Sequence, residues 1–230
     1  MQDAPSWFAE VVDDARRRAR GRVSALRAEH PEEDQVALGR RLVKAAATRA
    51  GWYGAATGTL ALITLPIGLP AGIAVSLLLE AELIFALLEL YDLETSGEAG
   101  RLKLYALWAG AGFADAAKSV GLRSGARALG RVVWESLPGQ LIRKLNPALL
   151  RAILKRLGLG WLPRALKLWP LLGAPISFVL DRAALRTLGE ATLATLDDAA
   201  RARRRAGKPL RKRPRNPGRK KTVRLKIARA

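Results

Sequence analysis

The stretch "GAATGTLALITLPIGLPAGIAVSLLLEAELIFALLELYD", residues 54–92, decides the fold. No charged side chain occurs anywhere in residues 50–79, a run longer than the roughly 20 apolar residues that a membrane-spanning helix needs. Pro66 and Pro70 interrupt this run, and each removes a backbone donor and clashes with the preceding helical turn. The stretch therefore predicts two helices joined by a tight link, "LPIGLP", at residues 65–70.

The two predicted helices cover residues 54–65 and 71–91. At 1.5 Å per residue they would be about 18 Å and about 31 Å long. Only the second matches a hydrocarbon core of about 30 Å, and it carries Glu80, Glu82 and Glu89. Three carboxylates argue against a lipid-facing span, so the hairpin is expected to form the core or to insert shallowly.

The acidic residues of this hairpin have two interpretations. Glu82 and Glu89 are seven residues apart and share a helix face, with Asp92 nearby, so their oxygens could serve a hard cation. No fixed ligand spacing supports a metal site. The favoured interpretation is a polar stripe that faces water or pairs with Arg101 and Lys103.

The rest of the chain predicts an all-α multi-helix bundle. Half of the 230 residues are hydrophobic and only 6% are aromatic; Ala and Leu dominate, and such side chains lose little rotamer freedom in a helix. Further helices are expected at residues 6–28, 32–53, 101–117 and 174–205. The expected apolar contacts of the first are Phe8, Val11, Val12, Ala15, Ala19, Val23 and Leu26, and those of the second are Val36, Leu38, Leu42, Val43 and Ala46.

Three regions are predicted: an N-terminal Arg-rich helix at 1–31, a helical domain at 32–206, and a polybasic tail at 207–230 with too little apolar surface to order itself. Lys and Arg total 40 against 20 Asp and Glu, a formal charge of +20. Such an excess indicates an anionic partner, either nucleic acid or an anionic lipid surface. No cofactor is expected.

Residues 118–170 hold most of the candidate contact residues. Their helices combine an apolar face with a cationic face and are flanked by Trp, which suits the headgroup plane of an anionic leaflet, although plain packing with snorkelling side chains remains an alternative. The predicted membrane or anion contacts here are Arg143, Lys144, Arg151, Lys155, Arg156, Trp161, Arg164, Lys167 and Trp169.

The tail is the second candidate contact region. It would bind anionic lipid, RNA or DNA by the same counterion physics. It has no aromatic residue to stack on a base, and no nucleic-acid-binding motif precedes it, so membrane attachment is favoured. The predicted contacts are Arg211, Lys212, Arg213, Arg219, Lys220 and Lys221.

No catalytic constellation is present in the sequence. The chain has no Cys, and its one histidine, His30, lies in a polar turn with no nucleophile or carboxylate pair at a suitable spacing. The start of the chain carries acids and a dense Arg run where a secretory signal would be apolar, so a cytoplasmic location is expected. An enzyme is not expected.

Two segments resemble the bacterial EcsC family. "AAATRAGWYGAATGTLALITLPIGLPAGIAVSLLLEAELIFALLELYDLE" has its Gly-rich helix, its Pro-containing link and an "ALLELYDLE"-like end, and "LWPLLGAPISFVLDRAALRTLGEATL" looks like its "P-x-x-GA" turn into a helix. The resemblance covers roughly residues 45–196. It implies an α-helical bacterial protein encoded beside a transporter linked to secretion, with no catalytic or binding residues to carry over. The Arg-rich first helix and the basic tail depart from the family.

These observations predict a non-enzymatic, membrane-associated helical protein, peripheral at the cytoplasmic face of the cell membrane. The resemblance implies an accessory role in transport or secretion. Its expected partners are anionic lipids. The alternative is a soluble helical scaffold that binds RNA or DNA through the polybasic tail.

Overall fold

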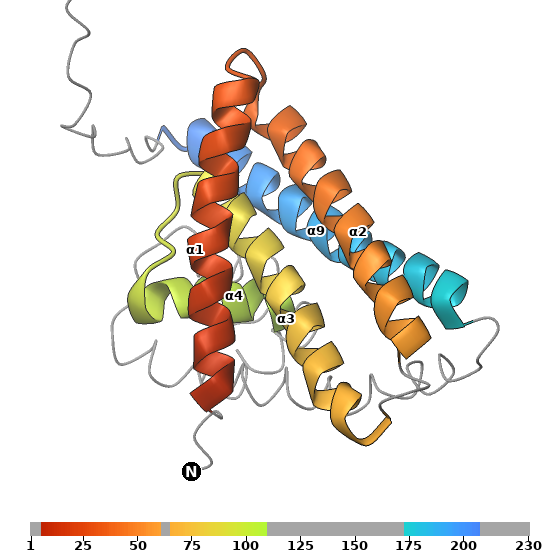
Figure 1. Cartoon of the computed structure of the whole chain (residues 1–230). Helices are drawn as coiled ribbons and strands as arrows, with labels where there is room; N and C mark the ends of the chain where they lie inside the picture. Colours follow the sequence, from red (N-terminus) through yellow and green to blue (C-terminus); the bar gives the residue numbers. More distant parts are fainter. Residues whose placement is uncertain (1–5, 61–64, 110–172, 208–230) are drawn as a thin grey trace, which may run out of the picture.

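The computed structural model describes residues 6–60, 65–109 and 173–207, which form five helices and no strand (Figure 1). The helices are α1 (Ser6–Glu29), α2 (Gln35–Leu60), α3 (Leu65–Leu90), α4 (Gly97–Ala109) and α9 (Gly173–Arg205). The all-α prediction is confirmed. The predicted helix at 101–117 begins four residues earlier, at Gly97, and is described as far as Ala109.

The hairpin differs from the sequence prediction in where it breaks. α2 runs unbroken to Leu60 and unites the helices predicted at 32–53 and 54–65. α3 begins at Leu65, so the predicted link at 65–70 is wrong, because these residues are helical. Pro66 costs little there, since the first four N–H groups of a helix have no intrahelical acceptor, and Pro70 removes a single bond.

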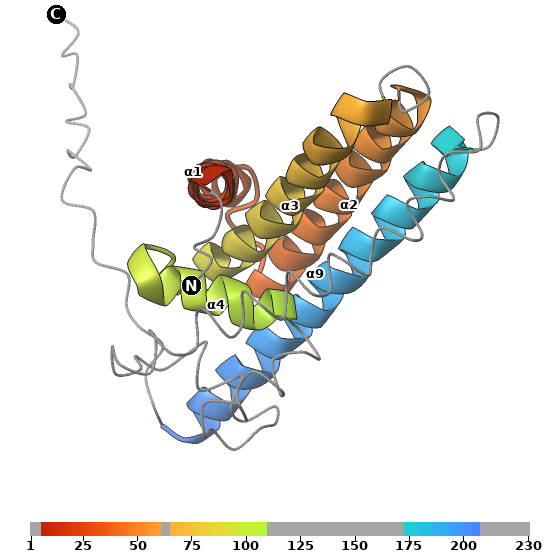
Figure 2. The same cartoon turned by 90° about the horizontal axis from the view of Figure 1, so that it is seen from below.

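α3 is the central helix of the bundle. It contacts α1, α2, α4 and α9, and in Figure 2 it lies beside α2, with α1 on one side and α9 on the other. From residue 81 to residue 90 every side chain except that of Glu89 is buried. A helix that is apolar on all sides is stable only when it is enclosed. This half of the hairpin is therefore core.

α1 crosses α3 and shares the same core. Figure 2 views α1 end-on while α2, α3 and α9 are seen along their length. Its predicted apolar stripe is confirmed from Val11 onward: Val12, Ala15, Ala19 and Val23 are buried in the common cluster, and Val11 and Leu26 pack at its margin. The side chain of Phe8, the first residue of the predicted stripe, lies outside the described part of the chain. The Arg-rich helix is thus joined to the rest by an apolar face, with its arginines along the edges.

α2 and α9 run antiparallel in close contact, and glycines make that contact possible. A Cβ at Gly39 would lie 2.6 Å from a methyl carbon of Leu193, and one at Gly189 would lie 2.8 Å from Val43. Gly51 lies in the same way against Phe178. Missing side chains at such positions let two helices approach each other closely. These glycine contacts were not predicted from the sequence.

Candidate functional site

The most enclosed charged group of the described residues is Glu82, in the middle of α3. Only 3% of its side chain is exposed, and its carboxylate forms ion pairs with Arg22 of α1 and, at 3.2 Å, with Arg49 of α2. Burial raises the pKa of Glu82, and the nearby charges of Arg22 and Arg18 oppose that rise. Glu82 thereby connects three helices through one carboxylate.

The other acids of α3 also have specific partners. Glu89 accepts a hydrogen bond from Thr95 Oγ1 at 2.7 Å and lies 3.4 Å from the guanidinium of Arg20. Glu80 accepts a hydrogen bond from Nε1 of Trp108. The stripe of carboxylates is therefore a structural feature whose partners come mainly from α1 and α4.

The predicted partners of this stripe, Arg101 and Lys103, are engaged elsewhere. Arg101 lies 3.5 Å from Asp13 of α1, and buried Lys103 donates to the carbonyl oxygen of Glu94 at 2.9 Å. The prediction of a stripe that faces water or pairs with Arg101 and Lys103 is wrong for Glu82, which is buried and paired with Arg22 and Arg49, because the sequence does not reveal that the arginines of α1 lie across α3. No group of three or more potential metal ligands occurs within the described ranges.

The first candidate functional surface is an end of the bundle at which apolar side chains are exposed. The last turns of α2 and the first turns of α9 lie at the same end, where α3 also begins (Figure 1). Four large apolar side chains are exposed there: Trp52 (66%), Tyr53 (50%), Val179 (61%) and Leu180 (42%). The ring of Trp52 meets Phe178 edge-on at 5.4 Å, which joins the two helices. These four exposed residues are called the apolar end below.

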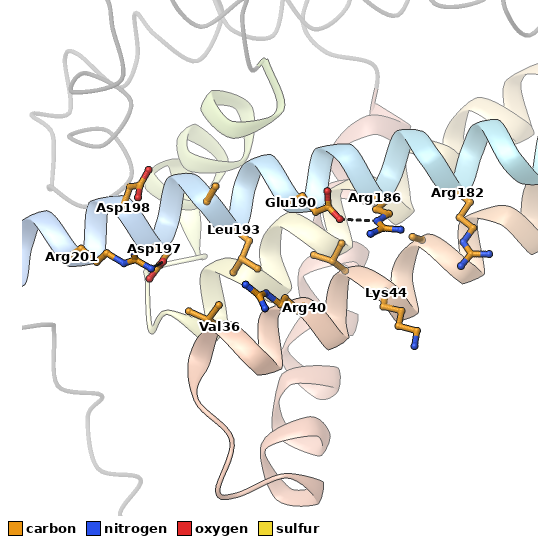
Figure 3. A pocket seen from close by; sticks show the side chains of 13 residues that line it. Val36, Arg40, Lys44, Arg182, Arg186, Glu190, Leu193, Asp197, Asp198 and Arg201 are labelled. Atoms are coloured by element: carbon orange, nitrogen blue, oxygen red, sulfur yellow. Dashed lines mark hydrogen bonds and ion pairs between the residues drawn. The ribbon is translucent and has the colours of Figure 1, made fainter.

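The second candidate functional surface is a cleft along the α2–α9 pair (Figure 3). Its volume is about 730 Å³, and buried Val43, Ala47 and Leu193 form its apolar floor. Exposed cations stand along it on both helices. They are Arg40, Lys44, Arg182, Arg186 and Arg201.

Acidic residues neutralise only part of this cleft. Glu190 accepts a hydrogen bond from Nε of Arg186 at 2.7 Å, and Asp197 pairs with Arg201 at 2.6 Å. Within the described part of the chain, no carboxylate lies in ion-pair contact with Arg40, Lys44 or Arg182, of which the last sits over the ring of Phe178 at 5.8 Å. Lys44 and Arg182 lie in the part of the cleft nearer the apolar end, and Arg40 lies between Leu193 and Glu190 (Figure 3).

His30 stands apart from both features, in the turn between α1 and α2. Its Nδ1 lies 3.5 Å from the carboxylate of Glu33, which is also held by Arg41 at 2.6 Å. The hydrogen bond from Arg41 holds the pKa of Glu33 below its ordinary value. These contacts fasten the turn to α2.

The contact residues predicted from the sequence lie outside the described residues. All fifteen fall in 143–169 or 211–221, beyond α4 or after α9. Their assignment stays a prediction. Trp52, Tyr53, Val179 and Leu180 were not predicted as contact residues. A signal was present for two of them: Trp52 and Tyr53 are aromatic residues near the start of the uncharged run, shortly after Arg49.

Comparison of the chain with protein-family models, curated proteins and solved structures finds no match. The resemblance to the EcsC family stays a prediction from residue patterns. Within the described residues, none of the helices has the combined length and apolar character required to cross a membrane.

Proposed function

We propose that this protein is a non-enzymatic helical protein that attaches peripherally to an anionic membrane surface through the apolar end of its bundle. It acts from the cytoplasmic face, in line with the EcsC-like role beside a transporter that the resemblance implies. Attachment needs no spanning helix, because an exposed apolar group can enter the headgroup region from one side.

The exposure of Trp52 carries this proposal. A Trp ring exposed to 66% is unusual for a side chain that buries a large apolar area in most folds. Trp and Tyr prefer the boundary between water and hydrocarbon, because one edge of the ring is polar and the rest is apolar. Trp52 and Tyr53 of α2, together with Val179 and Leu180 of α9, supply exposed side chains of this kind at one end of the bundle.

The charges near this end are placed for anionic headgroups. At 1.5 Å per residue, Arg182 is about 5 Å and Arg186 about 10 Å from Val179 along α9, and Lys44 is about 12 Å from Trp52 along α2. Cations at this height above inserted apolar groups would lie at the level of lipid phosphates. Basic residues near an anionic leaflet each contribute about 1 kcal/mol to attachment.

A vesicle flotation experiment tests the proposal with two variants that carry the same charge change. Val179→Asp places a carboxylate in the apolar end, and Ala202→Asp places one on the exposed side of α9 near its other end. Vesicles with 30% phosphatidylglycerol are expected to bind Ala202→Asp like the parent chain and Val179→Asp at least about tenfold more weakly, because apolar burial is lost and a charge must be desolvated.

Salt and truncation separate the apolar end from the tail. A chain that ends at Ala206 is expected to float still, with a smaller loss at high salt than the full chain, because fewer counterions are released. Equal binding of the two Asp variants would show that the apolar end does not touch lipid. If neither chain floats while the full chain shifts RNA with a steep salt slope, the scaffold that binds nucleic acid through its tail replaces this proposal.

A further inference from the structure

The cleft between α2 and α9 has the composition of a ligand site. Its volume of about 730 Å³ falls within the range of small-molecule pockets, about 300–1,000 Å³. The floor is apolar, with Val43, Ala47 and Leu193 buried beneath it, and the rim is charged. A ligand that fits must therefore carry both an apolar part and an ionic part.

The sign of the charge on the rim selects an anion. Arg186 and Arg201 are matched by Glu190 and Asp197, so they contribute little net charge. Arg40, Lys44 and Arg182 remain without a carboxylate partner among the described residues, and Figure 3 shows them on the same side of the helix pair. The remaining acid of the rim, Asp198, lies sixteen residues from Arg182 along α9, about 24 Å away.

The type of cation points to phosphate. A guanidinium group presents a planar fork of donors that matches phosphate oxygens in a bidentate manner, and an ammonium group adds a point charge. Two of the four guanidinium groups on the rim, those of Arg40 and Arg182, have no carboxylate partner among the described residues, and Lys44 lies between them along the helix pair. The axial spread from Arg40 to Arg182 also leaves room for the glycerol portion of a headgroup.

We propose that the α2–α9 cleft binds the phosphate-bearing headgroup of an anionic glycerolipid, with the phosphate at Lys44 and Arg182 and the acyl-chain side toward the apolar floor and the apolar end. This inference rests on the proposed membrane attachment and names the lipid group that the attachment site recognises. Arg182, which lines the cleft, lies one turn from exposed Val179 along α9, so the cleft begins close to the apolar end.

The test measures the cleft without a bilayer. Dihexanoyl-phosphatidylglycerol, kept below its micelle concentration, is titrated into the full chain by calorimetry, with inorganic phosphate as the second probe. The lipid is expected to bind at least about tenfold more tightly than phosphate, because phosphate cannot use the apolar floor. Equal affinity for both probes would overturn the assignment to a lipid.

Two double variants locate the site. Lys44→Gln with Arg182→Gln is expected to weaken binding of the short-chain lipid at least about tenfold, because two charge-assisted contacts are lost. Arg17→Gln with Arg205→Gln removes the same charge from exposed positions on α1 and at the end of α9, and is expected to leave the affinity within about twofold. Both pairs are exposed, and circular dichroism checks that each variant keeps its helicity.

The outcomes separate this inference from the proposed function. Vesicle binding that depends on Val179, together with no binding of the short-chain lipid, overturns the headgroup site and leaves membrane attachment in place. Equal weakening by the two double variants overturns it as well, because it reduces the effect to net charge. Arg182→Lys is expected to recover only part of the affinity lost in Arg182→Gln, because lysine restores the charge without the bidentate fork.

Discussion

The two helices that flank the α2–α3 hairpin are held by different interactions. α1 lies against α3 with arginines at the edges of its apolar stripe, and the buried carboxylate of Glu82 draws them in. α9 lies against α2 through glycines at the contact, such as Gly39 and Gly189, where a charge would have no room. The difference teaches that one core can be closed by paired charge on one side and by close approach of backbones on the other.

The largest loss of stability is expected at the contact between α1 and α3, where Glu82 pairs with arginines. Glu82→Ala leaves Arg22 and Arg49 near the core without their carboxylate. The free energy of unfolding should fall by about 3 kcal/mol, because an unpaired buried charge is costly. The loss should not be larger, because both arginines are partly exposed. Urea unfolding followed by circular dichroism measures the change. Glu29→Ala, at an exposed site on α1, is the matched control. A loss below about 0.5 kcal/mol for Glu82→Ala would mean that α1 is held by apolar contacts alone.

A smaller loss of stability is expected at the contact between α2 and α9, where glycines let the helices approach closely. Gly189→Val places a branched side chain where a single Cβ would already lie 2.8 Å from Val43 and 2.9 Å from Leu83. Overpacking of this kind should lower the free energy of unfolding by about 2 kcal/mol. The same urea titration measures it. An unchanged midpoint would show that α9 can move away from α2 at no cost, and would break the contrast between the two sides.

A substitution at the glycine of α1 is expected to stabilise the chain, in contrast to the two changes above. Gly21 is in the middle of a helix, and a Cβ there would meet no atom within 4 Å. Gly21→Ala should raise the free energy of unfolding by up to about 1 kcal/mol, because alanine favours the helix and nothing is displaced. Thermal unfolding checks the direction. Destabilisation by Gly21→Ala would place a further contact on this face of α1.

The smallest expected effect is a pH dependence of the free energy of unfolding, which should come from the α1–α3 contact and not from the α2–α9 contact. Since burial raises the pKa of Glu82, the folded chain holds this proton more tightly than the unfolded chain. The contribution of Glu82 to the free energy of unfolding is therefore greatest below the ordinary pKa of a glutamate and decreases as pH rises through the raised value. The change should stay below about 1 kcal/mol, because Arg22 and Arg18 oppose the shift.

Stability measured from pH 4 to pH 7 in parent, Glu82→Gln and Gly189→Val chains tests this. Glu82→Gln should lose the pH-dependent part of the free energy of unfolding, and Gly189→Val should keep it, since the contact between α2 and α9 does not involve Glu82. A component that survives in Glu82→Gln belongs to another acid.

Much of the fold could be predicted from residue patterns. The apolar stripe of α1 and the core residues Leu38, Leu42, Val43 and Ala46 of α2 are buried as periodicity indicated. The bend of the hairpin was misplaced, because two prolines were taken as a break, although Pro66 lies in the first turn of α3, where proline is tolerated, and Pro70 costs α3 only one backbone hydrogen bond. Close helix contacts at Gly39 and Gly189 require knowledge of which helices are neighbours, which periodicity does not contain.

The candidate surfaces could not be located from the sequence. Net charge predicts an anionic partner, either nucleic acid or an anionic lipid surface, and aromatic residues beside cations were the expected signature of membrane contact; both stay predictions. The cleft joins Lys44 to Arg182, residues far apart in sequence. No single helix shows both, so amphipathic patterns drew attention to residues 118–170 instead.

The length of α9 sets a distance from the membrane. From Val179 to Arg205 the helix rises about 39 Å, several times the Debye length of about 8 Å at physiological salt. If the apolar end touches lipid and α9 stands upright on it, this length sets the distance between the surface and the start of the tail at Gly207. α9 then acts as a spacer: shortening it by whole turns would change how strongly the tail contributes to vesicle binding without altering a single charge.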